Sequence, residues 1–154
     1  MAHQTFEVSV TTLVIHNSRI LLTKRASNKK RYANLWSFPG GHVEEQDYIG
    51  LSHNSAGVAY KIFERTARRE VREETGIEIT KPQYLTNMEL GNGEVLVVSM
   101  VAGVQPDSAG LLRPDGVENV EVGWFTLDEA LRLPLIDGVQ EEILLAQNRG
   151  YFGL

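Results

Sequence analysis

Apolar residues change their spacing along the chain, and these changes divide it into successive elements. Residues 8–15 are rich in β-branched side chains, and residues 19–23 repeat that character after a polar turn at 16–18, so the two runs predict a β-hairpin. Residues 24–34 are polar and basic and predict a loop. Residues 35–41 form a short apolar run that is halted by one proline and two glycines.

The next segment passes from no period to a helical one. Residues 42–57 have loop composition, with Asn54 or Ser55 as a candidate helix cap. Residues 58–75 then have the three- and four-residue spacing of an amphipathic helix, and Gly76 stands where such a helix ends. The apolar stripe consists of Tyr60, Phe63, Ala67 and Val71, and the opposite, basic face of Lys61, Arg65, Arg68 and Arg72.

The last part of the chain alternates between strands, loops and short helices. The predicted elements are, in order, strands at 84–90 and 94–104 joined by a Gly-Asn-Gly turn, a loop at 105–118, a strand at 120–126, a helical turn at 127–131 and a helix at 138–148. Asp137 is the expected cap of the last helix and Gly150 its stop. The order predicts an α/β fold, a mixed β-sheet covered by helices, in one domain over residues 1–154.

Composition excludes several classes of protein. The chain has 154 residues, of which 42% are hydrophobic and 23% charged, which argues against a disordered, collagenous or coiled-coil protein. It has no cysteine, which excludes disulfides, cysteine-ligated metals and a thiol nucleophile. A net charge of −5 disfavours general binding to a nucleic-acid backbone. Because neither a membrane span nor a secretory signal pattern is present, we expect a cytoplasmic protein without membrane or nucleic-acid polymer partners.

Three glutamates share one face of the predicted helix. Glu70, Glu73 and Glu74 lie at positions i, i+3 and i+4, within an arc of about 100°. Like charges this close repel each other unless a cation lies among them, and hard divalent cations prefer oxygen ligands. The face is therefore a candidate site for Mg²⁺ or Mn²⁺ beside a phosphorylated substrate. The alternative is a solvated helix face on which neighbouring arginines compensate the charge.

The surrounding sequence resembles the Nudix hydrolases. Their signature reads G-x5-E-x7-R-E-U-x-E-E-x-G-U, where U is a bulky aliphatic residue, and residues 69–77 match its second half at each specified position. Gly41, preceded by Pro39 and Gly40, matches the first glycine, and residues 121–129 are similar to the family's last strand and following turn. The resemblance implies a Nudix-type α/β/α sandwich that hydrolyses a diphosphate linkage in a nucleotide or nucleotide derivative.

One departure lies inside the signature. The family has 13 residues between the first glycine and the arginine, whereas 27 separate Gly41 from Arg69 here, an excess of 14. Counting forward from Gly41 puts Asp47 at the position of the first glutamate, and counting back from Arg69 puts Lys61 there. We expect the extra residues to loop out, so that Asp47 pairs with Arg69 and residues 48–57 form a mobile lid or specificity loop. The next candidate partners of the arginine are Glu44, Glu45 and Glu64.

The resemblance also implies roles for individual residues. The implied metal ligands, which include the catalytic glutamates, are Glu70, Glu73, Glu74 and the Gly40 carbonyl. Arg69 would orient the glutamates through charge-assisted hydrogen bonds. The general base stays open among Glu73, Glu74, Glu118 and Glu121. The last two are alternatively surface charges at a strand end.

Candidate substrate contacts precede the Pro-Gly-Gly turn. Five positive charges fall within eight positions there, and Arg25, next to a strand end, is the preferred phosphate ligand, whereas Lys29 and Lys30 favour a solvated loop. Tyr32 and Trp36 are candidates for stacking on a base. Three histidines are not spaced as metal ligands relative to one another, and we expect them to be structural or surface residues: His16, His42 and His53.

The sequence leaves the branch of substrate open. Residues 21–41 partly resemble the upstream motif of coenzyme A pyrophosphatases, and residues 35–41 equally resemble nucleoside triphosphate hydrolases of the MutT type. The proline that ADP-ribose hydrolases carry beyond the signature has no counterpart at Asn92 or Gly93, which disfavours ADP-ribose. A Nudix-fold binding module without turnover is the non-enzymatic alternative, and a homodimer is compatible with the sequence.

Overall fold

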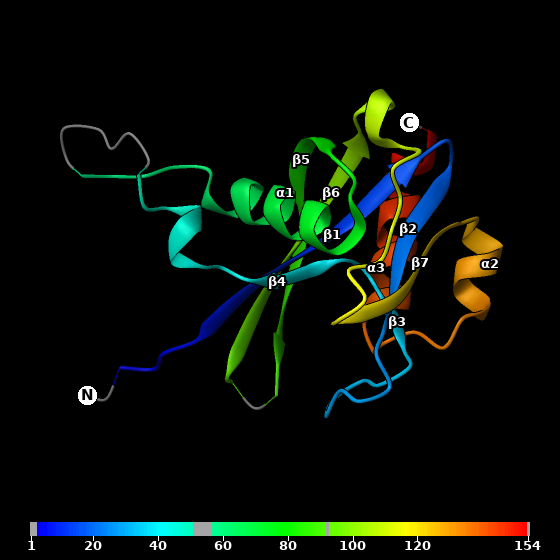
Figure 1. Cartoon of the computed structure of the whole chain (residues 1–154). Helices are drawn as coiled ribbons and strands as arrows, with labels where there is room; N and C mark the ends of the chain where they lie inside the picture. Colours follow the sequence, from blue (N-terminus) through cyan, green and yellow to red (C-terminus); the bar gives the residue numbers. More distant parts are fainter. Residues whose placement is uncertain (1–2, 51–56, 92, 154) are drawn as a thin grey trace.

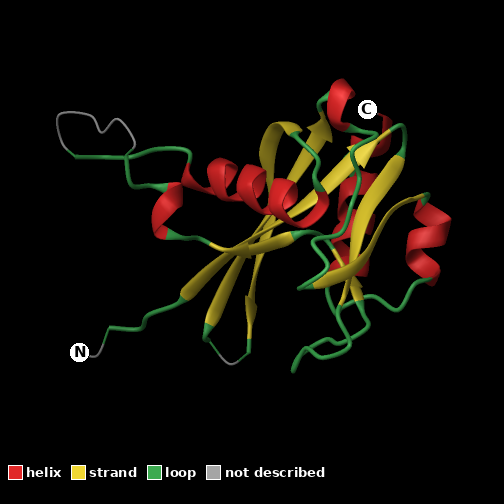
Figure 2. Ribbon diagram, viewed as in Figure 1, coloured by secondary structure: helices red, strands yellow, loops and turns green. Residues whose placement is uncertain are grey.

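A mixed seven-stranded sheet forms the centre of the molecule, in a computed structural model that describes residues 3–50, 57–91 and 93–153 (Figures 1 and 2). The strand order is β3-β2-β1-β6-β5, with β4 added to β1 and β7 to β2. The strands are β1 (Glu7–His16), β2 (Arg19–Arg25), β3 (Trp36–Ser37), β4 (Gly40–His42), β5 (Ile79–Leu90), β6 (Val95–Val104) and β7 (Asn119–Phe125). The helices are α1 (Ile62–Thr75), α2 (Leu127–Arg132) and α3 (Val139–Asn148), with 3-10 turns η1 (Glu45–Asp47), η2 (Pro106–Ser108) and η3 (Tyr151–Gly153).

Strand β1 joins the parts of the sheet. It pairs in parallel with β6 over most of its length, antiparallel with β4 near Gly41, and antiparallel with β2 at its end. The predicted hairpin of β1 and β2 is confirmed. Its two turn residues, Asn17 and Ser18, have φ of 48° and 58°, and two left-handed residues make the tight turn whose twist suits a hairpin.

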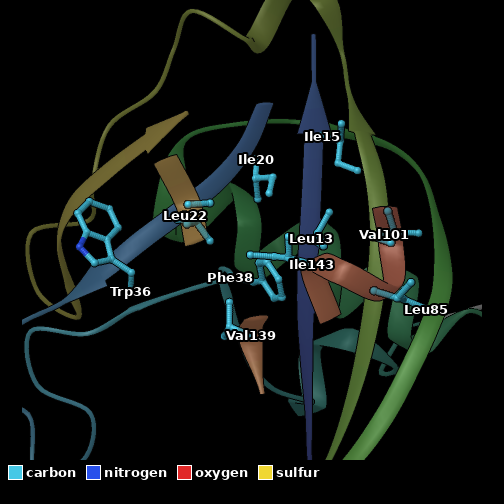
Figure 3. Close-up of a cluster of buried hydrophobic side chains, with 12 residues drawn as sticks. Leu13, Ile15, Ile20, Leu22, Trp36, Phe38, Leu85, Val101, Val139 and Ile143 are labelled. Atoms are coloured by element: carbon cyan, nitrogen blue, oxygen red, sulfur yellow. The ribbon is translucent and has the colours of Figure 1, made fainter. Parts of the chain in front are cut away.

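The two faces of the sheet are covered by different helices. Val10 and Val14 point from β1 to the side of α1, where they pack in one cluster with Ala67 and Val71. Leu13 points the opposite way and packs with Ile143 of α3 in a second cluster (Figure 3). Because side chains alternate along a strand, β1 supplies both layers. The predicted α/β/α arrangement is confirmed.

Helix α1 begins at Ile62 and not at Val58, which corrects its predicted start. Lys61 precedes the helix with φ 61°, a left-handed conformation that interrupts the helical path. Tyr60 therefore lies outside the apolar stripe and is 68% exposed, whereas Ala67 and Val71 are fully buried. The predicted end is confirmed, since Gly76 has φ 75° and donates its N–H to the Arg72 carbonyl.

Other element boundaries also differ from prediction. β5 starts at Ile79, five residues earlier than predicted, and accommodates Pro82 because it is an edge strand with register shifts. Lys24 and Arg25 end strand β2 and are not loop. Gly138, and not Asp137, precedes α3, with φ 94°.

The segment predicted as loop at 42–57 includes two elements, since His42 ends β4 and the turn η1 follows. The candidate cap at Asn54 or Ser55 and most of the predicted lid at 48–57 lie outside the described residues. None of the helices in the described parts of the chain is long and apolar enough to cross a membrane.

Candidate active site

Helix α1 turns its glutamates toward the Pro-Gly-Gly turn. Glu70 and Glu74 are buried, each 8% exposed, whereas Glu73 faces solvent. The Gly40 N–H donates a hydrogen bond of 3.2 Å to Oε2 of Glu74. All three glutamates line one cavity of about 380 Å³, together with Gly40, Gly41, His42, Glu44, Asp115, Val117 and Glu118. The cavity is thus predominantly acidic.

The guanidinium of Arg69 organises one side of this cavity. Its Nη1 donates to Oε1 of Glu70 at 2.6 Å and to Oε2 of Glu73 at 3.2 Å. Its Nη2 donates to the His42 carbonyl at 2.9 Å, which ties the helix to β4. Arg69 is 6% exposed, so these bonds act in a largely dry environment. The side chain therefore fixes the orientation of two glutamates.

Asp47 is the anionic partner of Arg69, as predicted. Nε and Nη2 of Arg69 donate to Oδ1 and Oδ2 of Asp47 at 2.8 and 2.9 Å, a bidentate pair. Oδ2 also accepts from the Thr66 hydroxyl and the Glu44 N–H. Burial alone would raise the pKa of Asp47, but these hydrogen bonds outweigh burial, and its pKa is lowered. Glu44, an alternative partner, lies 3.9 Å from Nη1 and is secondary.

Two glycines let the helix approach the sheet. A Cβ on Gly41 would lie 2.5 Å from Oε1 of Glu70, so the Glu70 carboxylate occupies the space that any other residue would fill. A Cβ on Gly40 would overlap the backbone of Val10 and Thr11 in the neighbouring strand. Neither Gly40 nor Gly41 has the left-handed backbone conformation that would by itself favour glycine. The two glycines are therefore needed because a side chain at either position would clash where the helix and the neighbouring strand approach this turn.

The residues present fit a hard divalent cation. Glu70, Glu73, Glu74 and the Gly40 carbonyl present oxygen atoms, the ligands that such a cation prefers. Burial, and then the charge of Glu70, raise the pKa of Glu74 to about 8. No three acidic or imidazole groups within the described residues enclose a cation by themselves. Mg²⁺ at this face would complete its ligands with waters and substrate phosphate oxygens.

A second cavity of about 390 Å³ continues from the first, and both are lined by Gly40, Gly41, His42, Glu74 and Glu118. Its own lining includes two arginines, an aromatic ring and hydroxyl groups: Arg25, Arg31, Tyr32, Thr11, Thr23 and Ser37. One end of the combined cleft is therefore acidic, whereas the other carries cations and hydrogen-bonding groups.

The predicted substrate residues divide between this cleft and the core. Arg25 lines the second cavity, and its Nε donates to the Arg31 carbonyl, which shapes the loop around it. Tyr32 lines the same cavity and is 39% exposed. The prediction that Trp36 stacks on a nucleotide base is wrong, because the residue is only 7% exposed and packs edge-on against Phe125 in the core.

The two late glutamates differ in position. Glu118 lines both cavities and forms an ion pair with Lys29 at 2.9 Å, so Lys29 is not a free solvated charge. Glu121 lines neither cavity and pairs with Lys24 across the strands at 2.7 Å. The structure therefore brings Glu118, and not Glu121, to the site.

Two site residues were missed by the sequence analysis. Asp115 accepts backbone hydrogen bonds from Val117, Glu118 and Asn119, and so shapes the loop beside the glutamates. Asn119 is buried, its Nδ2 donates to Oδ2 of Asp115 at 3.2 Å, and its side chain acts to lower the pKa of Glu74. The Asp115-Gly116 pair signals a turn, but nothing local to it signals proximity to α1.

The histidines have the structural or surface positions expected of them. The His16 ring packs against Trp124, with centroids 5.7 Å apart. His42 is exposed and its Nδ1 lies 3.1 Å from the Ser9 hydroxyl. His53 lies outside the described residues.

Comparison with known proteins decides the family. A sequence model of the NUDIX domain matches residues 5–147. The chain belongs to the Nudix family. This Nudix chain is 31% identical over 127 residues to the CTP pyrophosphohydrolase of Escherichia coli (strain K12), with 82% of this chain and 80% of that protein covered. It is 35% identical over 66 residues to the NAD-capped RNA hydrolase NudC of Vibrio vulnificus, which covers 43% of this chain and 24% of that protein.

Solved structures agree with the Nudix fold. The solution structure of the E. coli ORF135 protein has a TM-score of 0.66 and 25% identity, and the match covers 96% of this chain and 94% of that one. The NUDIX domain of Shewanella oneidensis NrtR has a TM-score of 0.73 at 19% identity, over 96% and 90% of the two chains, and shows likeness of fold. The predicted family, fold and class of hydrolase, acting on diphosphate linkages of nucleotides, are confirmed.

Proposed function

We propose that this Nudix hydrolase cleaves a nucleoside triphosphate and uses Mg²⁺ or Mn²⁺ held by Glu70, Glu73, Glu74 and the Gly40 carbonyl. The observation that carries the proposal is the packing of Glu70 and Glu74 against the glycine turn, where two buried carboxylates face a cleft whose other end is cationic. The relative that acts on CTP supports the nucleoside triphosphate branch over coenzyme A derivatives.

The acidic end would carry out the chemistry. Bound Mg²⁺ would neutralise phosphate charge and lower the pKa of a water molecule. A carboxylate base, Glu73, Glu74 or Glu118, takes a proton from the attacking water as its oxygen bonds to phosphorus. The bridging P–O bond breaks, and the leaving phosphate takes the electron pair. Arg69, anchored by Asp47, keeps two of the glutamates aligned throughout.

The other end would hold the nucleoside. Arg25, which lines this end, would bind a phosphate or ribose oxygen, and Tyr32, which lines it as well, would stack on the base. We further propose a single Nudix domain over residues 1–154 in the cytoplasm, acting on small nucleotides and not on nucleic-acid polymers. The net charge of −5 supports the last point. A homodimer remains compatible with these features.

A substrate panel tests the proposed function. It contains the common nucleoside triphosphates, a coenzyme A derivative, ADP-ribose and a capped RNA, each incubated with Mg²⁺ or with EDTA, and the products are identified by mass spectrometry. We expect Mg²⁺-dependent conversion of at least one nucleoside triphosphate to a monophosphate and pyrophosphate. If only another class of compound in the panel is hydrolysed, that class is the substrate and the proposed triphosphate is wrong. If nucleotides bind but none is hydrolysed, the protein is a regulatory module.

The role of the glutamates is tested by Glu74→Gln. We expect turnover to fall by about 10² or more at equal Mg²⁺, because removal of a catalytic carboxylate removes transition-state stabilisation. Glu64→Gln is the matched control, since Glu64 lies on the same helix and lines neither cavity. Near wild-type turnover of Glu74→Gln would remove Glu74 from the site.

A further inference from the structure

The five cations that precede the Pro-Gly-Gly turn differ in how their charge is compensated. Two of the lysines form ion pairs with the late glutamates. Lys30 is exposed and does not line the second cavity. Arg25 and Arg31 both line the second cavity, and neither forms an ion pair with any residue that the structure describes. The nucleoside end of the cleft therefore has two cations without a carboxylate partner.

Arg31 lies at the boundary between the second cavity and a third one. The third cavity has a volume of about 550 Å³, and Arg31 and Val95 line both. The Arg31 Nη1 would be 3.7 Å from a Cβ atom on Gly91, so the guanidinium reaches the turn between β5 and β6. Glu7 and Glu94 line the third cavity, yet no ion pair joins either of them to Arg31 within the described part of the chain. The charge of Arg31 is thus open to a ligand where the second cavity continues into further space.

The backbone that carries Arg31 is held in place by its own loop. The Arg31 carbonyl accepts a hydrogen bond of 3.2 Å from Nε of Arg25. The Asn34 N–H donates to the Arg25 carbonyl at 3.2 Å and closes the loop. Tyr32 and Asn34 have φ of 59° and 63°, and residues with side chains keep such a left-handed conformation only where their surroundings hold it. Arg31 and Tyr32 are therefore presented to the cavity together.

The direction of the cleft indicates what the Arg31 charge would bind. In the proposed function the phosphate chain lies with Mg²⁺ at the acidic end, and the base stacks on Tyr32 at the other. Phosphates that a metal neutralises do not require a cation at the opposite end of the cleft. A nucleotide can carry a further negative charge there on the 2′ or 3′ oxygen of its ribose, as a phosphate. A guanidinium group binds phosphate through paired, charge-assisted hydrogen bonds.

We propose that Arg31 binds a second phosphate group, carried by the 2′ or 3′ oxygen of the ribose of the bound nucleotide. This rests on the proposed function, because it takes the second cavity as the nucleoside end. The favoured substrates are then nucleotides that are phosphorylated on the ribose as well as on the 5′ oxygen. The second phosphate is either a monoester or the diester that joins one further nucleotide, for which the third cavity leaves room.

Products of hydrolysis isolate the second phosphate from the rest of the nucleotide. Calorimetry with Mg²⁺ compares CMP with cytidine 3′,5′-bisphosphate, and AMP with the 3′,5′- and 2′,5′-bisphosphates of adenosine. The proteins are wild type, Arg31→Gln and Arg31→Lys. Lys30→Gln is the matched control, because it removes the same charge from the same loop at a residue that lines neither cavity.

In wild type, at least one bisphosphate should bind about fivefold or more tightly than its monophosphate at low ionic strength, as one partly exposed ion pair allows. Added salt should reduce this ratio. Arg31→Gln should bring the ratio close to one, whereas Arg31→Lys should keep part of it, because it retains the charge without the paired donors. Lys30→Gln should keep the wild-type ratio. The melting temperature of Arg31→Gln should stay near wild type, since the residue is exposed.

Two further measurements extend the test to the source of the phosphate and to turnover. A 5′-phosphorylated dinucleotide that binds as tightly as the bisphosphate supports the diester, and a preference confined to the bisphosphate supports the monoester. In turnover, ATP with an added 3′ phosphate should have a higher kcat/KM than ATP through a lower KM, because this contact is equal in ground and transition states.

Three results would overturn the inference: equal affinities for every monophosphate and bisphosphate pair in wild type, an unchanged ratio in Arg31→Gln, or a loss of the ratio in Lys30→Gln as well. The affinities require no turnover, so the proposed function is judged separately. Hydrolysis of triphosphates without a preference for bisphosphates leaves the proposed function standing and the inference wrong. A preference that depends on Arg31, without hydrolysis of any triphosphate, overturns the proposed reaction and supports Arg31 as a phosphate ligand.

Discussion

Glu74 lies where the apolar sheet meets a group of like charges, and several neighbours act on its protonation. Burial is the largest cause that raises its pKa to about 8, and the charges of Glu70 and Asp115 add to it. Hydrogen bonds from Gly40 and Asn119 act in the opposite direction. Near neutral pH the side chain therefore holds a proton for much of the time in the absence of metal. Cation binding would displace that proton, so affinity for metal should rise with pH.

The raised pKa predicts how stability depends on pH in the metal-free protein. A carboxyl whose pKa is higher in the folded state contributes stability that is fully present below its ordinary value of 4.5 and is lost as pH rises to about 8. In EDTA, the free energy of unfolding should fall over this window by an amount on the order of a few kcal/mol. Glu74→Gln should flatten the slope, as measured by urea unfolding at several pH values. A parallel slope in the variant would contradict the assignment.

At the scale of elements, the turn η1 and the helix α1 are held together by one buried ion pair. Asp47 is 2% exposed and Arg69 6%, and the pair joins segments that are separated by the residues of the insertion. The acidic residue that supports the arginine therefore lies beside α1 despite the excess residues between them in the sequence. The same aspartate binds Thr66, so it also anchors the first turns of α1.

A double-mutant cycle measures this connection. Asp47→Asn should lower the free energy of unfolding by about 3–5 kcal/mol, because Arg69 is left buried without a full counter-charge. Metal affinity should fall as well, since Glu70 and Glu73 lose their fixed donor. With Arg69→Gln in the same chain, the two effects should be strongly non-additive, whereas simple addition would show that the side chains do not interact.

The left-handed residue before α1 gives a second prediction at this scale. Lys61 has φ 61°, which costs a residue with a side chain about 1–2 kcal/mol. Lys61→Gly removes that cost but loses more entropy on folding, so we expect stability to rise by up to about 1 kcal/mol. Lys61→Ala keeps the strain and should give no such gain. Thermal unfolding of the two variants side by side decides between these outcomes.

The elements show which features are predictable from sequence and why. The hairpin and the stripe of Ala67 and Val71 follow from local periodicity, and the glutamates follow from a short signature. The start of α1 does not, because a lysine in a left-handed conformation has no compositional signal. The burial of Trp36 and the arrival of Asn119 beside Glu74 depend on how distant strands are paired. Local sequence patterns do not predict which distant strands pair.

On the scale of the whole molecule, one sheet separates two apolar layers. Ile79 lies in the layer of α1 and Ile143 in the layer of α3, and both are fully buried. The layers share the backbone of β1, so neither can lose its packing without affecting the other. The proposed single domain therefore predicts one cooperative unfolding transition.

Substitutions in the two apolar layers test whether both unfold in one transition. Ile79→Ala and Ile143→Ala should each lower the free energy of unfolding by about 2–5 kcal/mol through lost burial and a cavity. Because the sheet lies between them, the effects should add in the double variant. Fluorescence and circular dichroism should report the same midpoint in every variant. Two separated transitions would show that the layers unfold independently.

The parallel pairing of β1 with β6 also determines the order in which the chain can fold. The partners of β1 on that strand lie 88 positions further along, as for Thr11 and Ser99. A chain made from its N-terminus exposes the β-branched run of β1 long before β6 exists, and such long-range pairing is slow. During that interval the future centre of the sheet is an unpaired, apolar edge, which is the kind of segment that aggregates. β1, which contributes to the wall of the cleft, is thus the strand most exposed to aggregation during synthesis. The yield of refolded protein at increasing protein concentration should therefore be more sensitive to substitutions in β1 than to substitutions in α3.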